Sequence, residues 1–558
     1  MSYRPNLKDL RFCLDHVIGM DDHYQSGAFP DFDADLRDAI LDAAGQLAGD
    51  VLAPLNRVGD LHGAKLDGNR VVIAPGFLEA IKVYADGGWY GLAAEPEHGG
   101  QGMPKMLEQA CFSLFHAANM AFTLLPTLSQ AAIDALQVHG TQAQQALYLP
   151  RLISGEWLGT MNLTEPGAGS DLAALKTRAE RNPDGSYRIT GQKIFITWGE
   201  HDGADNILHL VLARLPDAPA GTRGISLFLC PKYRVSADGA LGERNGVHCV
   251  GLEHKMGIHA SPTCVMAYED AHAELVGVEN GGLAAMFTMM NAARLAVGFE
   301  GVGLADAALQ KAQTYAQERR QGRSVITGED YAPIKDHPDV RLMLGLMQAK
   351  TEAARAICMA TAAATDAVRL ATDETVRQRH KRREDFLVPI AKAWSTDRAV
   401  EVASMGVQVH GGMGFIEETG AAQYYRDARI APIYEGTNGI QAGDLVGRKL
   451  GSDGLAAREL ASDIADFMQN KALQASFQTE LTQLQTALDA FTAASEHLLK
   501  QKAEAPLDVA AAATTYLTLA GDLVGGWLLL KGALKASAMI ATGDADGAWL
   551  KQRIAIMR

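Results

Sequence analysis

Apolar residues recur at two different spacings along the chain, and the change of spacing separates its parts. Helical spacing, with apolar residues three or four apart, predicts amphipathic helices over 35–44, 77–84, 106–118, 130–139 and 142–154. Strand spacing, with β-branched and apolar residues alternating with polar ones, predicts strands over 187–197, 208–212 and 224–230. Residues 182–186, Asn-Pro-Asp-Gly-Ser, predict a turn between strands.

Helical spacing returns at about residue 282 and continues, with breaks, to the last residues. The predicted helices cover 282–320, 339–375, 385–410, 467–499 and 510–542. We therefore predict an α+β multidomain protein in which an all-β domain lies between helical ones. The expected boundaries are 1–155 (N-terminal helical), 156–278 (β), 279–450 (C-terminal helical) and 455–558 (an additional helical domain).

Composition and charge exclude several classes of protein. The chain has 558 residues, too many for one core, and 47% of them are hydrophobic, as is usual for soluble proteins. Its formal net charge of −15 argues against a nucleic-acid surface and against electrostatic binding to an anionic membrane. The most apolar run, 509–530, contains Asp522, which favours a buried helix over an integral membrane segment.

The cysteines and the first residues add two expectations. The six cysteines are scattered without metal-ligand spacing, so we expect buried thiols and no metal site. Residues 1–5 lack the apolar core of a signal peptide, so we expect a cytoplasmic protein.

The strongest candidate for chemistry is Glu435, within Pro-Ile-Tyr-Glu-Gly-Thr-Asn-Gly-Ile-Gln at 432–441. Apolar neighbours would raise its pKa towards the range in which a carboxylate removes protons. The glycines at 436 and 439 would let a ligand approach the backbone. An ordinary loop glutamate before a helix is the alternative, and local chemistry alone does not separate the two.

Three further motifs have equally plain alternatives. Residues 161–171 present hydroxyl and amide groups among small residues, which could hydrogen-bond a flat heterocycle or a phosphate. The alternative is an ordinary turn at the start of the strand domain. Residues 408–414 offer backbone amides, or a glycine cap that ends a helix. The arginines in 317–323 suit a pyrophosphate, or form a solvated helix end. The chain has no dinucleotide-binding glycine fingerprint and no phosphate-binding P-loop.

Together, these motifs resemble the acyl-CoA dehydrogenase family. They read Leu-Thr-Glu-Pro-Gly-Ala-Gly-Ser-Asp at 163–171, Lys-Ile-Phe-Ile-Thr at 193–197, Gln-Val-His-Gly-Gly-Met-Gly at 408–414 and Ile-Tyr-Glu-Gly-Thr at 433–437. The resemblance covers about 35–450 and implies a middle β-barrel domain and a C-terminal four-helix-bundle domain. The added helical block resembles the longer bacterial branch, which includes the 3-methylmercaptopropionyl-CoA dehydrogenases.

The resemblance also implies roles for single residues. Glu435 matches the catalytic base. Contacts with an FAD cofactor are implied for Leu163, Thr164, Gly169, Ser170, Phe195, Ile196, Thr197, Arg319, Gln321, Gln408, Gly411, Gly412, Thr437 and Asn438. Contacts with the acyl-CoA substrate are implied for Ser170, Asn291, Arg294, Tyr434 and Gly436.

Three positions qualify this assignment. Phe195 replaces a tryptophan found in many relatives, and Gln321 replaces a common threonine. Arg319 and Gln321 match residues that reach a neighbouring subunit's FAD, so a homodimer or a dimer of dimers is implied. Some relatives carry their base immediately before Arg294, where this chain has Ala293, which cannot accept a proton.

The implied reaction is FAD-dependent α,β-dehydrogenation of an acyl-CoA thioester to the trans-2-enoyl-CoA. Glu435 would take the α-proton while the β-hydride passes to flavin N5. The expected substrate is 3-(methylthio)propanoyl-CoA, which would give 3-(methylthio)acryloyl-CoA, and an electron-transferring flavoprotein is the expected acceptor. The alternatives are a medium- or long-chain fatty acyl-CoA dehydrogenase of β-oxidation, an acyl-CoA oxidase, and a DNA-associated member without enzymatic activity.

Overall fold

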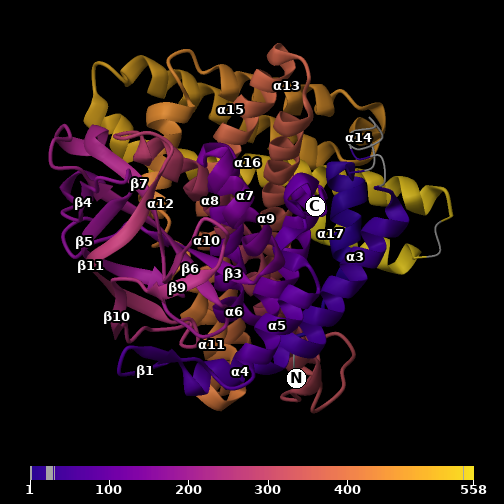
Figure 1. The fold of residues 1–558 in the computed structure, drawn as a ribbon. Coiled ribbons are helices and arrows are strands. Elements are labelled where there is room, and N and C mark those ends of the chain that lie inside the picture. Colours follow the sequence, from indigo (N-terminus) through magenta and orange to yellow (C-terminus); the bar gives the residue numbers. More distant parts are fainter. Residues whose placement is uncertain (1–2, 21–28, 30–31, 544–545) are drawn as a thin grey trace. The chain divides into compact units, whose positions relative to one another are not determined.

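The computed structural model describes residues 3–20, 29, 32–543 and 546–558 (Figure 1). Residue contacts divide the chain into two compact units, each assembled from separate stretches of sequence. Unit 1 consists of Met1–Gly45, Pro104–Ala117 and Arg294–Arg558, and unit 2 consists of Gln46–Met103 and Ala118–Ala293.

The strands of unit 2 form a closed ring, which confirms the predicted β-barrel. In ring order they are β11 (Thr263–Val276), β5 (Tyr187–Thr197), β4 (Arg178–Arg181), β6 (Asn206–Arg214) and β7 (Ile225–Pro231), which returns to β11. Two further strands extend the sheet: β10 (Val247–Leu252) beside β11, and β3 (Trp157–Asn162) in parallel with β6. The two faces of the sheet belong to different buried apolar clusters: Val211 and Ala213 of β6 pack with residues of the other strands, whereas Leu208, Leu210 and Leu212 belong to a cluster that also contains helical residues such as Leu136 and Leu149.

The remaining elements of unit 2 are helices and two small sheets. They are α4 (Ala53–His62), the hairpin β1 (Lys65–Asp67) and β2 (Arg70–Val72), α5 (Phe77–Asp86), α7 (Gln142–Ser154) and the pair β8 (Tyr233–Val235) and β9 (Leu241–Arg244). The helices predicted over 77–84 and 142–154 are confirmed. Thr141 caps the start of α7 reciprocally. Its hydroxyl accepts a hydrogen bond from the Gln144 backbone N–H, and the Gln144 side chain accepts one from the Thr141 backbone N–H.

The helix α6 (Lys105–His139) is interrupted at Asn119, which has non-helical torsions (φ −163°, ψ 88°). Its side-chain oxygen accepts from the backbone N–H of Phe122 at 3.1 Å, so Asn119 caps the helical stretch that follows. The predicted end of a helix at residue 118 is therefore correct, and the next stretch begins earlier than the predicted residue 130.

The helices of unit 1 are long and closely packed. They are α1 (Leu7–Phe12), α3 (Ala34–Gln46), the second part of α8 (Gly282–Glu318), α9 (Pro338–Leu370), α10 (Glu374–His410), α11 (Ala421–Ala428) and α12 (Asn438–Asp444). A Cβ added to Gly298 or Gly301 of α8 would lie 2.9 Å from a backbone oxygen of α10, so these glycines permit the close approach that their spacing predicted.

The predicted start of α10 at residue 385 is wrong, because the helix begins at Glu374. Residues 374–384 are polar and charged and show no apolar spacing, so periodicity could not reveal them. Asp373 caps this end through the Val376 N–H, and Arg382 pairs with Glu459 of the next helical block at 2.6 Å.

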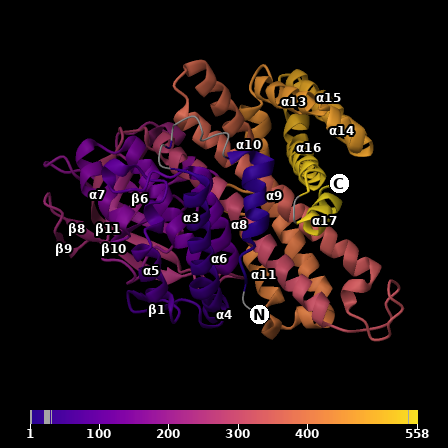
Figure 2. The same ribbon diagram turned by 90° about the vertical axis from the view of Figure 1, so that its right-hand side faces the viewer.

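A C-terminal block of helices completes unit 1 and confirms the predicted additional helical domain. It contains α13 (Leu455–Met468), α14 (Lys471–Ser476), α15 (Gln478–Gln501), α16 (Pro506–Ala541) and α17 (Gly547–Met557) (Figure 2). α16 packs against α10, where the ring nitrogen of Trp394 donates to Asp522 at 2.8 Å. Asp522, the charge that interrupts the most apolar run, therefore has a partner inside the fold.

Three described helices, α6, α8 and α16, are long and apolar enough to cross a membrane by length and composition. Inside the structure, 94%, 67% and 44% respectively of their most apolar windows are buried. Packing within the protein therefore accounts for almost all of the apolar surface of α6, and for a smaller share of that of α16.

Candidate active site

Glu435 lies in a turn between α11 and α12 and has a left-handed backbone conformation (φ 55°). Such a conformation is unfavourable for a residue with a side chain, and it persists only where neighbouring groups hold it. Gly436, also left-handed (φ 81°), follows, and a Cβ there would lie 2.9 Å from the side-chain nitrogen of Gln441. The turn therefore requires glycine at 436 and tolerates strain at 435.

Three buried side chains from different helices hold the carbonyl groups of this turn. Arg294 of α8 donates from Nε to the Glu435 carbonyl oxygen at 3.3 Å, and Gln441 of α12 donates to the same oxygen at 3.2 Å. Lys392 of α10 donates from Nζ to the Gly436 carbonyl oxygen at 3.0 Å. Among the described residues, none accepts a hydrogen bond from the Glu435 backbone N–H, so that amide can donate to a ligand.

The electrostatics of the turn suit a general base. Burial raises the pKa of Glu435 to about 7, while the positive charges of Arg294 and Lys392 oppose the rise. Burial lowers the pKa of Lys392 to about 8, against the attraction of Glu435 and other nearby carboxylates. A carboxylate whose pKa lies near neutrality can both accept and release a proton there.

Tyr434 and Glu300 form a second buried pair beside the base. The Tyr434 hydroxyl donates a hydrogen bond to Oε2 of Glu300 on α8. Glu300 is fully buried, and burial together with the charge of Glu435 raises its pKa to about 8, against the Tyr434 hydroxyl and Lys392.

The residues after the base begin α12. The Thr437 hydroxyl accepts from the Ile440 N–H at 3.2 Å and caps the helix. The Asn438 side chain is bound to α10: its nitrogen donates to Asp397 at 2.7 Å, and its oxygen accepts from Lys392 at 2.9 Å. Its side chain is thus engaged within the protein, whereas the Thr437 hydroxyl keeps its proton available for donation.

In unit 2, a buried ion pair holds the loop that follows β3. The fully buried Lys193 of β5 donates to Glu165 at 2.8 Å and to the carbonyl oxygen of Leu163 at 2.9 Å. Glu165 also accepts from the backbone N–H groups of Lys176 and Thr177. Thr164 is joined to β5 in the same way, because its carbonyl oxygen accepts from the Ile194 N–H at 2.9 Å. Thr164 and the 193–197 segment are therefore held together.

Phe195 points out of the barrel wall because the strand carries a bulge there. Opposite β11, the register shifts between Ile196 and Lys193, and Phe195 takes a left-handed conformation (φ 61°). Its ring is 57% exposed, while the neighbouring Ile196 is buried. The bulge therefore presents a large apolar ring at the surface of unit 2, next to Thr197 at the strand end.

The remaining predicted residues of unit 2 have less defined surroundings. Gly169 and Ser170 are exposed in the loop after β3, and no atom lies closer than 3.9 Å to a Cβ placed on Gly169. Asn291 lies on α8 and is partly buried. Nothing in these contacts assigns the three residues a ligand.

A third group of predicted residues lies at the ends of α8 and α10 in unit 1. Tyr315 and His410 stack with ring centroids 4.3 Å apart, which brings these helix ends together. Arg319 and Gln321 follow α8 and are exposed. Gln408, Gly411 and Gly412, at the end of α10, are exposed as well. The structure shows no hydrogen bond between this group and the Glu435 turn among the described residues.

The sequence did not single out three residues whose side chains bind the Glu435 turn: Lys392, Glu300 and Gln441. The first two are charged residues within apolar helical stretches, which is the signal that could have singled them out. No cluster of metal-ligating side chains occurs in the part of the chain that the structure describes, and all six cysteines are buried free thiols.

Family models match almost the whole chain. The descriptions are "Acyl-CoA dehydrogenase, N-terminal domain" for 38–156, "middle domain" for 160–271, "C-terminal domain" for 280–450, and "Acetyl-CoA dehydrogenase C-terminal like" for 460–558.

Individual proteins are similar over the same extent. The chain is 46% identical to a 3-methylmercaptopropionyl-CoA dehydrogenase of Ruegeria pomeroyi, over 100% of this chain and 95% of that protein. It is 34% identical to the broad-specificity linear acyl-CoA dehydrogenase FadE5 of Mycobacterium tuberculosis, over 97% of this chain and 92% of that protein. The solved structure of Caenorhabditis elegans ACDH-11 in complex with C11-CoA has the same fold, with a TM-score of 0.80 at 20% identity, over 100% of this chain and 92% of that one. The chain belongs to the acyl-CoA dehydrogenase family and is an FAD-dependent oxidoreductase that dehydrogenates an acyl-CoA.

Proposed function

We propose that Glu435 is the base that removes the α-proton of the acyl-CoA thioester. The observation that carries the proposal is the combination of a pKa of about 7 with a strained turn held by Arg294, Gln441 and Lys392. At neutral pH, about half of the Glu435 side chains are ionised and able to accept a proton. The three side chains bind backbone carbonyls, so the Glu435 carboxylate itself stays available for the substrate.

Removing an α-proton places negative charge on the thioester oxygen. A backbone N–H aimed at that oxygen stabilises the charge. The Glu435 N–H, which makes no hydrogen bond to the described residues, supports this role. Arg294, which is buried on α8, is proposed to contact the CoA moiety. Ser170, Asn291, Tyr434 and Gly436 are proposed as further substrate contacts.

The residues present fit FAD. The exposed ring of Phe195 offers an apolar face to a flat heterocycle, and Leu163, Thr164, Ile196 and Thr197 adjoin it on a rigid barrel wall. We propose that these residues hold the flavin together with Gly169 and Ser170. Contact with FAD is also proposed for Thr437 and Asn438, which follow Glu435 in the sequence. When bound, the flavin accepts the hydride from the β-carbon of the substrate.

We propose that the exposed group at the ends of α8 and α10 binds FAD of a neighbouring subunit. Its members are Arg319, Gln321, Gln408, Gly411 and Gly412. Arginine and exposed backbone amides suit a pyrophosphate, which supports this assignment. The protein would then be a homodimer or a dimer of dimers. The mass of the FAD-loaded protein, measured by analytical ultracentrifugation, distinguishes the two.

We further propose 3-(methylthio)propanoyl-CoA as the substrate and 3-(methylthio)acryloyl-CoA as the product. The support is the higher identity to the 3-methylmercaptopropionyl-CoA dehydrogenase, 46% against 34% for the linear acyl-CoA dehydrogenase. A medium or long straight acyl chain is the second candidate. Bleaching of the bound flavin by a panel from 3-methylthiopropanoyl-CoA to palmitoyl-CoA tests both, and faster bleaching by the long chain would overturn the first.

An electron-transferring flavoprotein is proposed as the electron acceptor, since both relatives are named dehydrogenases and not oxidases. Reoxidation of the reduced flavin by oxygen alone would contradict this. We place the protein in the cytoplasm and propose domain boundaries at 1–155, 156–278, 279–450 and 455–558, which lie close to the limits of the four family models.

The decisive experiment on the base is Glu435→Gln, which keeps the shape of the side chain and removes its ability to accept a proton. We expect FAD to be retained and turnover to fall by roughly 10²–10⁴-fold, the contribution of a positioned base. Glu418→Gln, at an exposed glutamate, is the control and should leave turnover unchanged. Near-wild-type turnover of Glu435→Gln would refute the assignment.

A further inference from the structure

Glu300 is a buried carboxyl group for which the reaction described above has no use. It lies on α8, six residues after Arg294, and none of its surface is exposed. Oε2 accepts the hydrogen bond of the Tyr434 hydroxyl, and Oε1 has no hydrogen-bond partner among the described residues. Burying a carboxyl with one oxygen unsatisfied lowers stability, so packing alone does not explain a glutamate here.

Tyr434 connects this carboxyl to the base. It immediately precedes Glu435, and its backbone N–H donates to Ile430 at 3.2 Å. The turn after Glu435 is held by Arg294, Gln441 and Lys392, which all bind carbonyl groups of residues 435 and 436. On the side that precedes Glu435, the corresponding side-chain anchor is the Tyr434 hydroxyl on Glu300.

We propose that Glu300 is a positioning residue of the dehydrogenation, which fixes the turn before Glu435 through the Tyr434 hydroxyl. The inference rests on the proposed role of Glu435 as the base. A left-handed turn relaxes when one of its anchors is removed, and even a small displacement of a reacting group slows a reaction strongly.

The groups that face Glu300 come from two elements. The turn contributes Glu435 and Tyr434, and α10 contributes Lys392. Lys392 also lies near the charge of Asp397, and Arg294 lies near the charges of Asp444 and Arg448. The pKa of Glu300, about 8, keeps this carboxyl protonated at neutral pH, so the second negative charge beside the base appears only in alkaline solution.

Three variants separate the anchor from the charge. Glu300→Leu removes the acceptor, Tyr434→Phe removes the donor, and Glu300→Gln keeps an acceptor but cannot ionise. We expect the first two each to lower kcat by roughly 10- to 100-fold with little change in KM. The double variant should be no slower than the slower single variant, because both changes break the same hydrogen bond.

Glu300→Gln should restore kcat to within a few-fold of wild type. Its acid limb in a plot of log kcat/KM against pH should stay in place, because Glu300, with a pKa of about 8, is already protonated and neutral in the pH range where Glu435 titrates. A purely structural role predicts that FAD content and the unfolding temperature fall together with kcat, whereas rescue of kcat by Glu300→Gln with KM unchanged indicates positioning.

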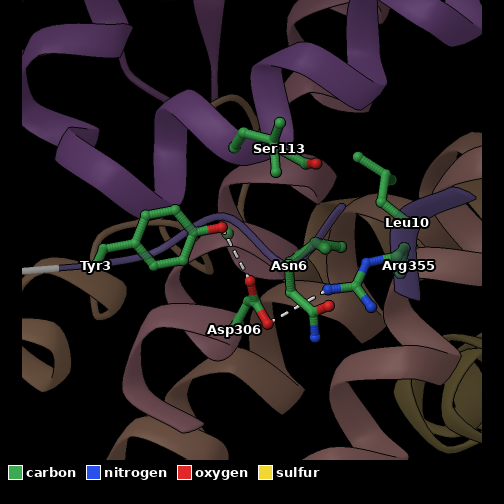
Figure 3. Close-up of a pocket in the computed structure, with 9 residues that line it drawn as sticks. Tyr3, Asn6, Leu10, Ser113, Asp306 and Arg355 are labelled. Atoms are coloured by element: carbon green, nitrogen blue, oxygen red, sulfur yellow. Dashed lines mark hydrogen bonds and ion pairs between the residues drawn. The ribbon is translucent and has the colours of Figure 1, made fainter. Parts of the chain in front are cut away.

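The chain offers a matched control on the same helix. Asp306 of α8 accepts from the Tyr3 hydroxyl at 3.0 Å and pairs with Arg355 at 3.4 Å, a second buried tyrosine–carboxyl pair (Figure 3). It lies six residues beyond Glu300 and makes no hydrogen bond to the Glu435 turn. Asp306→Asn and Tyr3→Phe should lower the unfolding temperature and leave kcat and the pH profile unchanged.

The outcomes separate this inference from the proposed base. If the losses of Glu300→Leu and Tyr434→Phe multiply in the double variant, or if neither lowers kcat by more than about twofold, Glu300 is not a positioning residue. Should Glu300→Leu fail to bind FAD or to fold, Tyr434→Phe and Glu300→Gln decide the question. An active Glu435→Gln would remove the base itself, whereas an inactive Glu435→Gln with unaffected Glu300 variants would remove only this inference.

Discussion

Replacing Lys392 with methionine removes a buried positive charge from behind the Glu435 turn. Lys392 is fully buried, and its Nζ donates to the Gly436 carbonyl oxygen at 3.0 Å and to Asn438 Oδ1 at 2.9 Å. Methionine has a similar length and no charge, so Lys392→Met keeps the packing while it removes both the charge and the hydrogen bonds to Gly436 and Asn438.

The expected size of the effect follows from the pKa of Glu435. That pKa is about 7, and the positive charges of Arg294 and then Lys392 hold it below the value that burial alone would set. Loss of one nearby opposite charge raises the pKa of a carboxyl by about one unit or more, and Arg294 remains. With a rise of one unit, the ionised fraction at pH 7 falls from about one-half to about one-tenth, so the loss of charge alone lowers kcat/KM about fivefold.

The direction of the pKa change of Glu435 determines how the loss of activity depends on pH. A higher pKa means that the base keeps its proton to higher pH, so the loss grows towards roughly tenfold in acid solution. Since the pKa of Lys392 is itself about 8, the wild-type lysine is largely neutral above that pH, so the electrostatic part of the difference should vanish there and only the loss caused by the missing hydrogen bonds should remain.

The assay is kcat/KM of flavin reduction measured from about pH 5.5 to about pH 9.5. Lys381→Met is the control, because Lys381 lies on the same helix but is 45% exposed and pairs with Glu384 at 2.8 Å. A Lys392→Met profile whose acid limb stays in place, or moves to lower pH, would refute the electrostatic account of the base.

Three further predictions concern packing and cofactor binding. Arg553→Met should lower the free energy of unfolding by about 3–5 kcal/mol in urea titrations, because it leaves the buried carboxylate of Glu352 without its partner. Gly521→Ala should lower it by about 1–3 kcal/mol, since the added Cβ would lie 2.2 Å from the Trp394 ring, and an unchanged unfolding curve would contradict this contact. Phe195→Ala should lower the FAD content after gel filtration, measured as the ratio of absorbance at the flavin band to that of the protein, whereas Phe195→Trp should retain it.

Much of the fold could be predicted because apolar spacing reports which face of an element is buried. The alternating stretch 187–197 is the strand β5 with the same limits, and the helical spacing in 35–44 marks α3. Apolar spacing does not reveal elements whose limits are set by polar contacts. The first turns of α10 are charged and pair with the C-terminal block, and the break in α6 depends on the side-chain contacts of Asn119.

The site shows the same division. Glu435, Arg294 and Phe195 could be named from motifs, because their chemistry is visible in the residue types and their order. Gln441 lay inside the recognised stretch, yet its part in holding the turn depends on its distance to a carbonyl oxygen. Lys392 and Glu300 lie 43 and 135 positions before the base in sequence and meet its turn only in the folded chain.

The sequence by itself determined the family and the order of helical and β regions, and it singled out Glu435 as the proposed base, because local periodicity and short motifs need no knowledge of distant residues. Only the tertiary structure decided the acidity of that carboxylate. The pKa of Glu435 depends on how deeply the turn is buried and on how close two cations from α8 and α10 approach it, and both are set by the packing of helices far apart in the chain.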